Sequence, residues 1–223
     1  MLSFTAKPRG WVLNAAAGVF IAVASTAIAT EPPSQDEAKT DPDAPRFISP
    51  DGRYGMLVTK DPDPYAGSDR VELIEVATKR SLVVLNDPEA PERSGDARLD
   101  WSKDSTRVAA YTGGRVSGST RLFVREGDGF VEVKLPRLPN LPNPEEPSAA
   151  FRKKHKFKFL KWITTDSLEF VQWLDSGEVE LKAYNEVETE EGRGFRAEIN
   201  LTLAIDAKHR ATLKKAVRKE SLE

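Results

Sequence analysis

The residues best suited to hold a charged ligand lie in one basic stretch, residues 152–162. This stretch contains six Lys or Arg side chains and one His, interleaved with Phe and Trp rings. Cations bind phosphate or carboxylate groups and aromatic rings stack on bases or sugars, so the composition fits an anion site. The candidate anion-binding residues are Arg152, Lys153, Lys154 and Lys156.

The same stretch also has a purely structural explanation, which we favour. In a β-strand over residues 156–162, Phe157 and Phe159 would point inward while Lys156 and Lys158 would point to water. Opposite charges on neighbouring strands would come from Glu178, Glu180, Glu186, Glu188, Glu190 and Glu191. The overall charge is mildly acidic, which argues against a nucleic-acid partner.

A second group of residues has the spacing of a calcium loop. Asp61, Asp63, Asp69 and Glu72 fall at positions 1, 3, 9 and 12 of a twelve-residue loop. Ala66 stands where such a loop requires glycine, and the flanking segments have strand patterns rather than helix patterns. We therefore expect a hairpin loop with solvated carboxylates and no metal site.

The sequence contains few residues in arrangements typical of catalytic sites. The chain has two histidines, His155 and His209, and no cysteine, which excludes thiol catalysis and Cys-ligated zinc. Gly-x-Ser-x-Gly, paired-His metal and Ser-x-x-Lys spacings do not occur, and the glycine-rich residues 113–119 lack the Lys-Ser/Thr ending of a phosphate loop. We predict no catalytic residue and no cofactor. The chain has 35 acidic residues, so a catalytic pair of carboxylates stays possible. Enzymatic activity therefore stays an open question.

The first 29 residues have the features of an export signal. Lys7 and Arg9 precede a nearly continuous apolar run over residues 11–24, and Ala27-Ile28-Ala29 has the small-x-small form of a cleavage site. We expect cleavage, a periplasmic or secreted mature protein, and no stable membrane span afterwards. The alternative is an uncleaved anchor, because residues 11–29 nearly reach the about 20 residues that span a bilayer.

Composition then divides the remaining chain. Residues 30–45 hold four prolines, five acids and one Lys with almost no apolar side chains, which predicts a disordered linker. Removal of residues 1–29 leaves 194 residues with 31 Lys or Arg against 35 acids, a net charge of −4. This length suffices for one domain with a hydrophobic core, and without cysteines its stability must come from burial and sheet hydrogen bonds.

One local pattern recurs three times, and it is followed by residues that alternate between polar and apolar. The copies are Ile48-Ser49-Pro50-Asp51-Gly52-Arg53, Trp101-Ser102-Lys103-Asp104-Ser105-Thr106 and Trp162-Ile163-Thr164-Thr165-Asp166-Ser167. Period-two alternation predicts strands, about four short ones in each copy. The resulting units are residues 46–87, 96–135 and 155–206, with a proline-rich spacer over 136–147. For the tail, residues 207–223, an apolar stripe favours a helix over a last strand.

The first two copies resemble the Ser-Pro-Asp-Gly turns of β-propellers similar to TolB and the WD40-like repeats. The resemblance implies an all-β domain over residues 46–206, a propeller-like stack of about three four-stranded antiparallel units. It also implies that Ile48 and Trp101 pack between neighbouring units. Closed propellers have at least about four blades, so we expect an open stack or closure by oligomerisation, with a β-sandwich as the alternative.

Together these features predict an exported, non-catalytic binding module that recognises a cell-envelope protein or glycan. Two alternatives stay open. One is a carboxylate-dependent hydrolase or lyase that acts on envelope polymers, which requires a concave pocket with two acids about 5 to 10 Å apart. The other is a structural or assembly protein whose open sheet edges pair with a neighbour, for example in a homo-oligomer.

Overall fold

The structure is a computed structural model that describes residues 44–60, 69–86, 96–114, 117–139, 147–156, 158–190, 192 and 194–222. For residues 159–165 it describes the backbone alone. All of these ranges belong to one compact unit, Thr40–Glu223. The predicted export signal, nearly all of the predicted linker, and Asp61 and Asp63 of the calcium-like loop lie outside the described residues. In the described ranges, no helix has the length and apolar character needed to cross a membrane.

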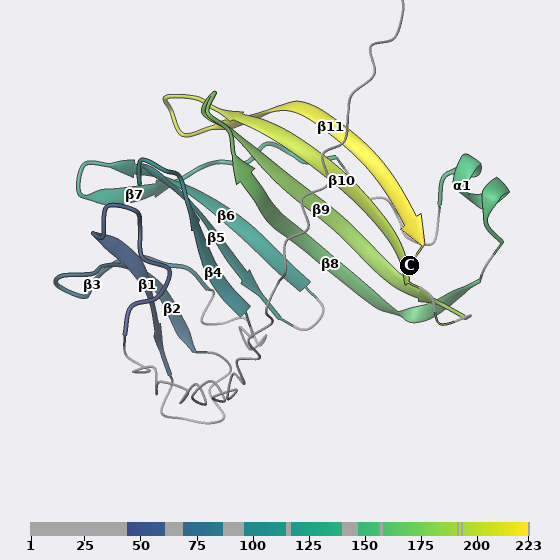
Figure 1. The fold of residues 1–223 in the computed structure, drawn as a ribbon, viewed down its shortest axis with the longest axis horizontal. Coiled ribbons are helices and arrows are strands. Elements are labelled where there is room, and N and C mark those ends of the chain that lie inside the picture. The colour runs from purple at the N-terminus through teal and green to yellow at the C-terminus, as the bar shows by residue number, and fades with distance from the viewer. Residues whose placement is uncertain are drawn as a thin grey trace, which may run out of the picture. The chain divides into compact units, whose positions relative to one another are not determined.

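Strands form most of the described chain, which confirms the all-β prediction (Figure 1). The first sheet contains β1 (Tyr54–Thr59), β2 (Arg70–Glu75) and β3 (Arg80–Val84). The second contains β4 (Asp96–Trp101), β5 (Arg107–Gly113), β6 (Ser117–Glu126), β7 (Gly129–Glu132), β8 (Phe159–Trp173), β9 (Glu178–Thr189), β10 (Gly194–Ile205) and β11 (Ala211–Leu222). The one described helix is α1 (Ala149–Lys154).

The larger sheet has the order β11-β10-β9-β8-β6-β5-β4, with β7 paired to β6. Strands β4 to β7 thus form the expected four-stranded unit, whereas the first unit contributes three strands. The second and third units share one sheet instead of forming separate sheets. They meet where β6 and β8 pair in parallel, at Ser117 with Asp166 and Gly118 with Ser167. Neither sheet closes on itself through its ladders.

The third copy of the repeated pattern is not a turn. Asp166 and Ser167 lie inside β8, where they pair with Asn185 and Tyr184 of β9. In the first two copies, by contrast, the residue after the Asp adopts a positive φ, 74° at Gly52 and 59° at Ser105. The third copy continues in extended conformation because β9 offers it a full ladder of partners. Only two of the three copies therefore share one layout.

The helix prediction for the tail is also wrong. Residues 211–222 form β11, which pairs antiparallel with β10 from Ile205 with Ala211 to Phe195 with Leu222. The turn before it is built by Asp206, whose carboxylate accepts hydrogen bonds from the amides of Lys208 and Arg210 at 2.8 and 2.9 Å. The helix-like spacing of apolar residues does not decide the conformation here, because pairing with β10 satisfies the backbone hydrogen bonds of every second residue along β11.

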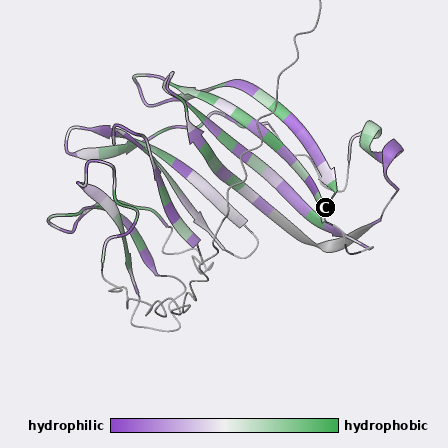
Figure 2. Ribbon diagram, in the orientation of Figure 1, coloured by the Kyte–Doolittle hydropathy of each residue, from purple (hydrophilic) through white to green (hydrophobic). Residues whose placement is uncertain are grey.

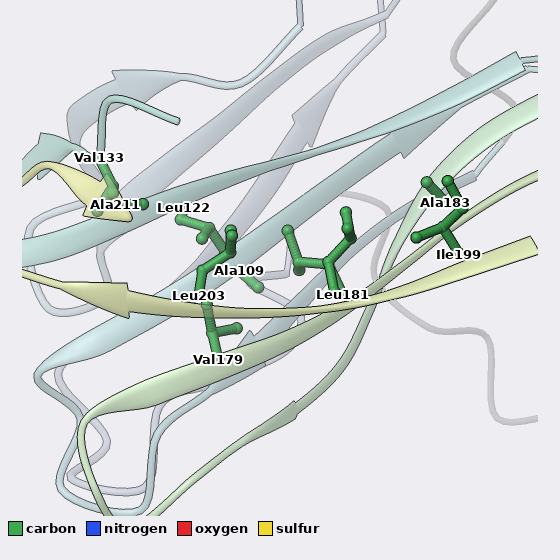
Figure 3. Packing of buried hydrophobic residues seen from close by; sticks show 10 residues of the cluster. Ala109, Leu122, Val133, Val179, Leu181, Ala183, Ile199, Leu203 and Ala211 are labelled. Carbon is green, nitrogen blue, oxygen red and sulfur yellow. The ribbon is translucent and has the colours of Figure 1, made fainter. Parts of the chain in front are cut away.

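Buried side chains form two main clusters that share β5 and β6. Ala109 and Leu122 pack with Leu181 of β9 and with Leu201 and Leu203 of β10 (Figure 3). Neighbouring positions of β5 and β6 point the other way, toward the three-stranded sheet. That second cluster contains Val108, Ala110 and Phe123 together with Met56, Val71, Leu73, Leu85 and Leu99. Hydrophilic and hydrophobic residues alternate along β9 and β10, as a half-buried sheet requires (Figure 2).

An isolated bridge links the segment after β7 to the start of the edge strand β11. Lys134, just after β7, forms a parallel bridge with Arg210 at the start of β11. The Lys134 amide donates to the carbonyl of His209 and the Ala211 amide donates to the carbonyl of Lys134, both at 2.9 Å. Val133 and Ala211 are buried in the same cluster beside this bridge. The sheet therefore curls around the cluster.

Candidate functional site

The two Asp-led turns have matching hydrogen bonds. Ser49 donates its hydroxyl to Asp51 at 2.6 Å, and Ser102 donates to Asp104 at the same distance. Each Asp also accepts the amide two residues further on, at 3.1 Å in both turns. The Ser49 hydroxyl accepts the Tyr54 amide at 3.0 Å, and the Ser102 hydroxyl accepts the Arg107 amide at 2.9 Å. These carboxylates complete turns, which is a structural role.

The turns also contact each other and an aromatic cluster. The Tyr54 ring lies 6.3 Å from Trp101 and 5.0 Å from Phe130, and its side chain is fully buried. Trp101 donates its indole N–H to the carbonyl of Phe47 at 2.7 Å. Ile48, in contrast, is 43% exposed, so its predicted packing between units is wrong. Trp101 reaches across to the first unit because its ring extends further than an aliphatic side chain.

The predicted anion-binding residues lie mainly on α1. Arg152, Lys153 and Lys154 form its last turn and Lys156 follows it, all four exposed. Ser148 caps the helix by accepting the Phe151 amide at 3.2 Å. The strand expected to start at residue 156 starts at Phe159, and Phe157 lies outside the described residues. Cations at the C-terminal end of a helix are stabilised by its free carbonyl groups. The helix therefore accounts for the clustering of these basic side chains without a bound anion.

One of the glutamates predicted to balance this stretch does so. Lys158 lies 4.0 Å from Glu190, and the Glu190 amide donates to the Lys158 carbonyl at 2.8 Å. Glu72 of the calcium-like loop has a different role: it is buried and accepts hydrogen bonds from Arg70 at 2.8 Å and from Ser81 at 2.5 Å. Over the described part of the chain, no group of three His, Asp or Glu side chains has the arrangement of a metal site.

A groove lies on the side of β8–β11 that faces away from the core, which we call the outer face. Its volume is about 290 Å³. The residues that line it are Val171, Glu180, Leu181, Asn200, Leu201, Thr202, Lys215, Val217 and Lys219. Val171 is 48% exposed and Val217 38% exposed, so the groove has apolar side chains open to solvent. Amide, hydroxyl, carboxylate and ammonium groups lie between them.

The ladder explains why the lining side chains other than those of Leu181 and Leu201, which are buried in the core, share one face. Thr202 pairs with Glu180 on one side and with Lys215 on the other, and Asn200 pairs with Val217. Directly paired residues point to the same side of a sheet. Val171 is the extra residue at a register shift between Phe170 and Gln172, which leaves its side chain exposed beside the groove. Irregular positions of this kind often redirect a side chain.

A polar network borders the groove on the same sheet. Glu169 of β8 accepts hydrogen bonds from the Tyr184 hydroxyl at 3.0 Å and pairs with Lys182 at 3.1 Å. Burial raises the pKa of Glu169, but the contacts with Lys182 and Tyr184 outweigh it and leave the pKa below its usual range. Burial and the Glu169 carboxylate raise the pKa of Tyr184. The Arg196 guanidinium lies 3.8 Å from the Tyr184 ring centroid. The network holds its members in place and leaves no poised acid or base.

Neither the groove nor the network could be located from the sequence. Their residues come from four strands spread over fifty positions, and only the alternation of β9 and β10 indicated which side chains would face outward. Asn200 and Thr202, which form a glycosylation-like triplet with Leu201, lie side by side in the groove lining. Comparison with known protein families and with curated proteins gives no match, so the site is interpreted from its own geometry.

Proposed function

We propose that this protein is an exported, non-catalytic binding module that recognises a cell-envelope component through the groove on its outer face. The single observation that carries the proposal is the groove lining. Solvent-exposed valines stand beside hydrogen-bonding side chains from three adjacent strands. Binding sites commonly combine apolar contact with a few convergent polar groups. The export address rests on the predicted signal sequence.

Between a protein and a glycan, the groove favours a protein. Its described lining contains aliphatic, amide, hydroxyl and charged side chains and no aromatic ring, whereas sugars are usually held against aromatic faces. The Tyr184 ring of the bordering network is covered by Arg196. The hydrolase or lyase alternative needs two facing carboxylates, and the described lining contributes Glu180, whose carboxylate accepts a hydrogen bond from Gln172 at 2.6 Å. That arrangement lends the alternative no support.

The propeller-like relationship belongs to this proposal as well. The matching hydrogen bonds of the two Asp-led turns support a common origin for the units over residues 46–87 and 96–135. The third unit instead extends the sheet of the second, which provides the broad outer face. The assembly alternative draws on the open edges of both sheets.

Site-specific photo-crosslinking tests the proposal. A photoreactive residue is placed at Val171 or Val217 in the exported full-length chain, with Val131 of β7 as the matched control, since it is 37% exposed and outside the groove. We expect a defined crosslinked envelope protein from the groove positions and none from Val131. The product should decrease when Asn200→Lys fills the groove. Equal crosslinking at all three positions would contradict the proposal. Competition by soluble envelope polysaccharide would indicate a glycan instead.

A further inference from the structure

Among the described strands, β11 lies at the edge of the larger sheet. It is twelve residues long and pairs with β10 on one side. Its first residue, Ala211, also contacts Lys134, but from Thr212 onward no other described strand adjoins it. Every second residue of such an edge presents an N–H and a C=O group that another extended chain can pair with.

Cations surround this edge on both faces. Four of the six residues over 214–219 are Lys or Arg, and all four are exposed. Lys215 and Lys219 point to the outer face with the groove, whereas Arg218 points to the opposite face, and Lys214 is the extra residue at a register shift. Arg218 pairs with Glu220 at 2.5 Å and Lys219 pairs with Glu198 at 3.7 Å. Four cations against these two carboxylates leave the edge with a net positive charge, which an added strand would meet.

The helix α1 adds further cations at the end of β11 (Figure 1). The Ser148 amide donates to the Glu220 carboxylate at 2.9 Å, and the Ser148 hydroxyl donates to its other oxygen at 2.5 Å. The Phe151 ring lies 5.2 Å from Phe195, which fixes the helix against the sheet. Arg152, Lys153 and Lys154 thereby extend the positive surface, although they are about sixty residues away in sequence.

Charge disfavours a second copy of this chain, paired antiparallel about Val217, as the occupant. If two β11 strands paired antiparallel about Val217, Lys215 of one copy would lie opposite Lys219 of the other. Like charges placed directly across a ladder are destabilising. An acidic strand has the reverse effect at each of these positions. The unpaired backbone groups of β11 fit an extended polypeptide, and the surrounding cations favour one with acidic side chains.

We propose that β11 binds an acidic, extended segment of a partner protein as an added β-strand. The inference rests on the proposed function, because it names the chemistry of a polypeptide partner. Backbone hydrogen bonds to the edge supply affinity, and the flanking Lys and Arg residues select acidic sequences. The added strand would lie beside the groove, where its outer-face side chains meet Lys215, Val217 and Lys219.

Three synthetic peptides separate strand addition from simple charge attraction. The first is a fluorescent twelve-residue peptide of alternating Glu and Val. The second has the same sequence with alternate backbone amides methylated, which keeps the charge but blocks the ladder. The third has Lys in place of Glu. Fluorescence anisotropy measures the binding of each peptide to the full-length chain. We expect the first peptide to bind and the third not to bind. The methylated peptide should bind about tenfold more weakly than the first, because it cannot form the ladder hydrogen bonds.

Variants assign the binding to β11. Lys214→Glu with Arg218→Glu changes two edge cations outside the groove lining and should weaken the first peptide by about tenfold. Lys103→Glu with Lys208→Glu, in exposed turns, is the control of equal charge change and should leave affinity within about twofold. Circular dichroism establishes that each variant is folded.

Equal binding of the methylated peptide, or unchanged binding by the edge variant, would overturn the inference. Anionic vesicles that bind in place of the acidic peptide would overturn it too. If the peptide does not bind at all, the cations only guard the edge against unwanted pairing. Crosslinking from Val171 in the Lys214→Glu, Arg218→Glu variant separates the two proposals: its persistence would leave the groove function standing while strand addition fails.

Discussion

Tyr111 occupies the space that a side chain on Gly118 would need: a Cβ atom at this glycine would lie 2.0 Å from the tyrosine hydroxyl oxygen. A Cβ atom at Gly113 would lie 2.6 Å from the same oxygen. The Arg98 guanidinium lies 4.7 Å from the ring centroid, and the tyrosine hydroxyl lies 3.4 Å from the Ser167 hydroxyl. Two glycines thus make room for a ring at the junction of β5, β6 and β8.

Gly118→Ala should therefore displace Tyr111 and lower the free energy of unfolding by about 1–3 kcal/mol. Denaturant titration measures the loss. Tyr111→Ala should lower the free energy of unfolding less in the Gly118→Ala background than in the natural chain, because removing the ring also removes its clash with the new methyl group. Gly129→Ala is the matched control: its nearest neighbour would be 3.9 Å away, and we expect little change. Additive effects of the two substitutions would contradict this account.

Ser105 connects the two Asp-led turns and should be sensitive to substitution. Its buried hydroxyl accepts the Asp51 amide at 3.0 Å, and its φ is 59°. Ser105→Ala removes the acceptor and should cost about 1 kcal/mol of unfolding free energy. Ser105→Gly should cost less, because glycine adopts a positive φ without strain. Thermal unfolding of both variants gives the order, and a larger loss for glycine would contradict the explanation.

The stability of the second turn should depend on pH through Asp104. The hydrogen bond from Ser102, reinforced by the Thr106 hydroxyl and amide and opposed by partial burial, lowers the pKa of Asp104 from 3.8 to about 2. Because the folded-state pKa is the lower one, the stabilisation is present above pH 3.8 and disappears as the pH falls toward 2.

Asp104→Asn should thus be less stable than the natural chain near neutral pH, by less than about 1 kcal/mol because the carboxylate is exposed. The difference should narrow between pH 4 and pH 2 in urea titrations, since unfolded Asp has a pKa of about 3.9. Asp175→Asn is the control: Asp175 is 99% exposed and pairs with Lys103 at 4.0 Å. A constant difference across this window would exclude Asp104 as the cause.

The network beside the groove offers a spectroscopic test. Burial and the Glu169 carboxylate both raise the pKa of Tyr184. Glu169→Gln removes the negative charge, so Tyr184 should lose its proton at a lower pH than in the natural chain. Tyrosinate absorbance, with Tyr184→Phe subtracted to isolate this residue, follows the titration. An unchanged midpoint would mean that the Glu169 carboxylate has no effect on the pKa of Tyr184, and a higher midpoint would contradict the direction assigned to that effect.

The parts of the fold that depend on local sequence were predictable. Alternation within the unit over residues 155–206 predicted strands, and two of them are present as β9 and β10. The Asp-led turns at Asp51 and Asp104 were predictable too, since their hydrogen bonds span only a few residues. The third copy misled the interpretation because its Trp and Asp belong to a strand whose partner lies about twenty residues away.

The candidate sites depend on contacts that sequence patterns do not encode. The groove requires the register among β8, β9, β10 and β11, which is set by long hairpins with three register shifts. Likewise, the hydrogen bonds from Ser148 to Glu220 join α1 to a strand 72 residues away. Basic composition indicated Arg152 to Lys154, but only the fold shows that β11 extends the same positive surface.

The bridge between Lys134 and residues 209–211 has a consequence for synthesis on the ribosome. A nascent chain can already form β4 to β7, but the wall opposite Leu122 and Val133 is missing until β10 and Ala211 have been translated. Until then those apolar side chains stay open to chaperones and proteases. A product that stops before residue 211 should be cleared rapidly, whereas one that stops after β11 should persist.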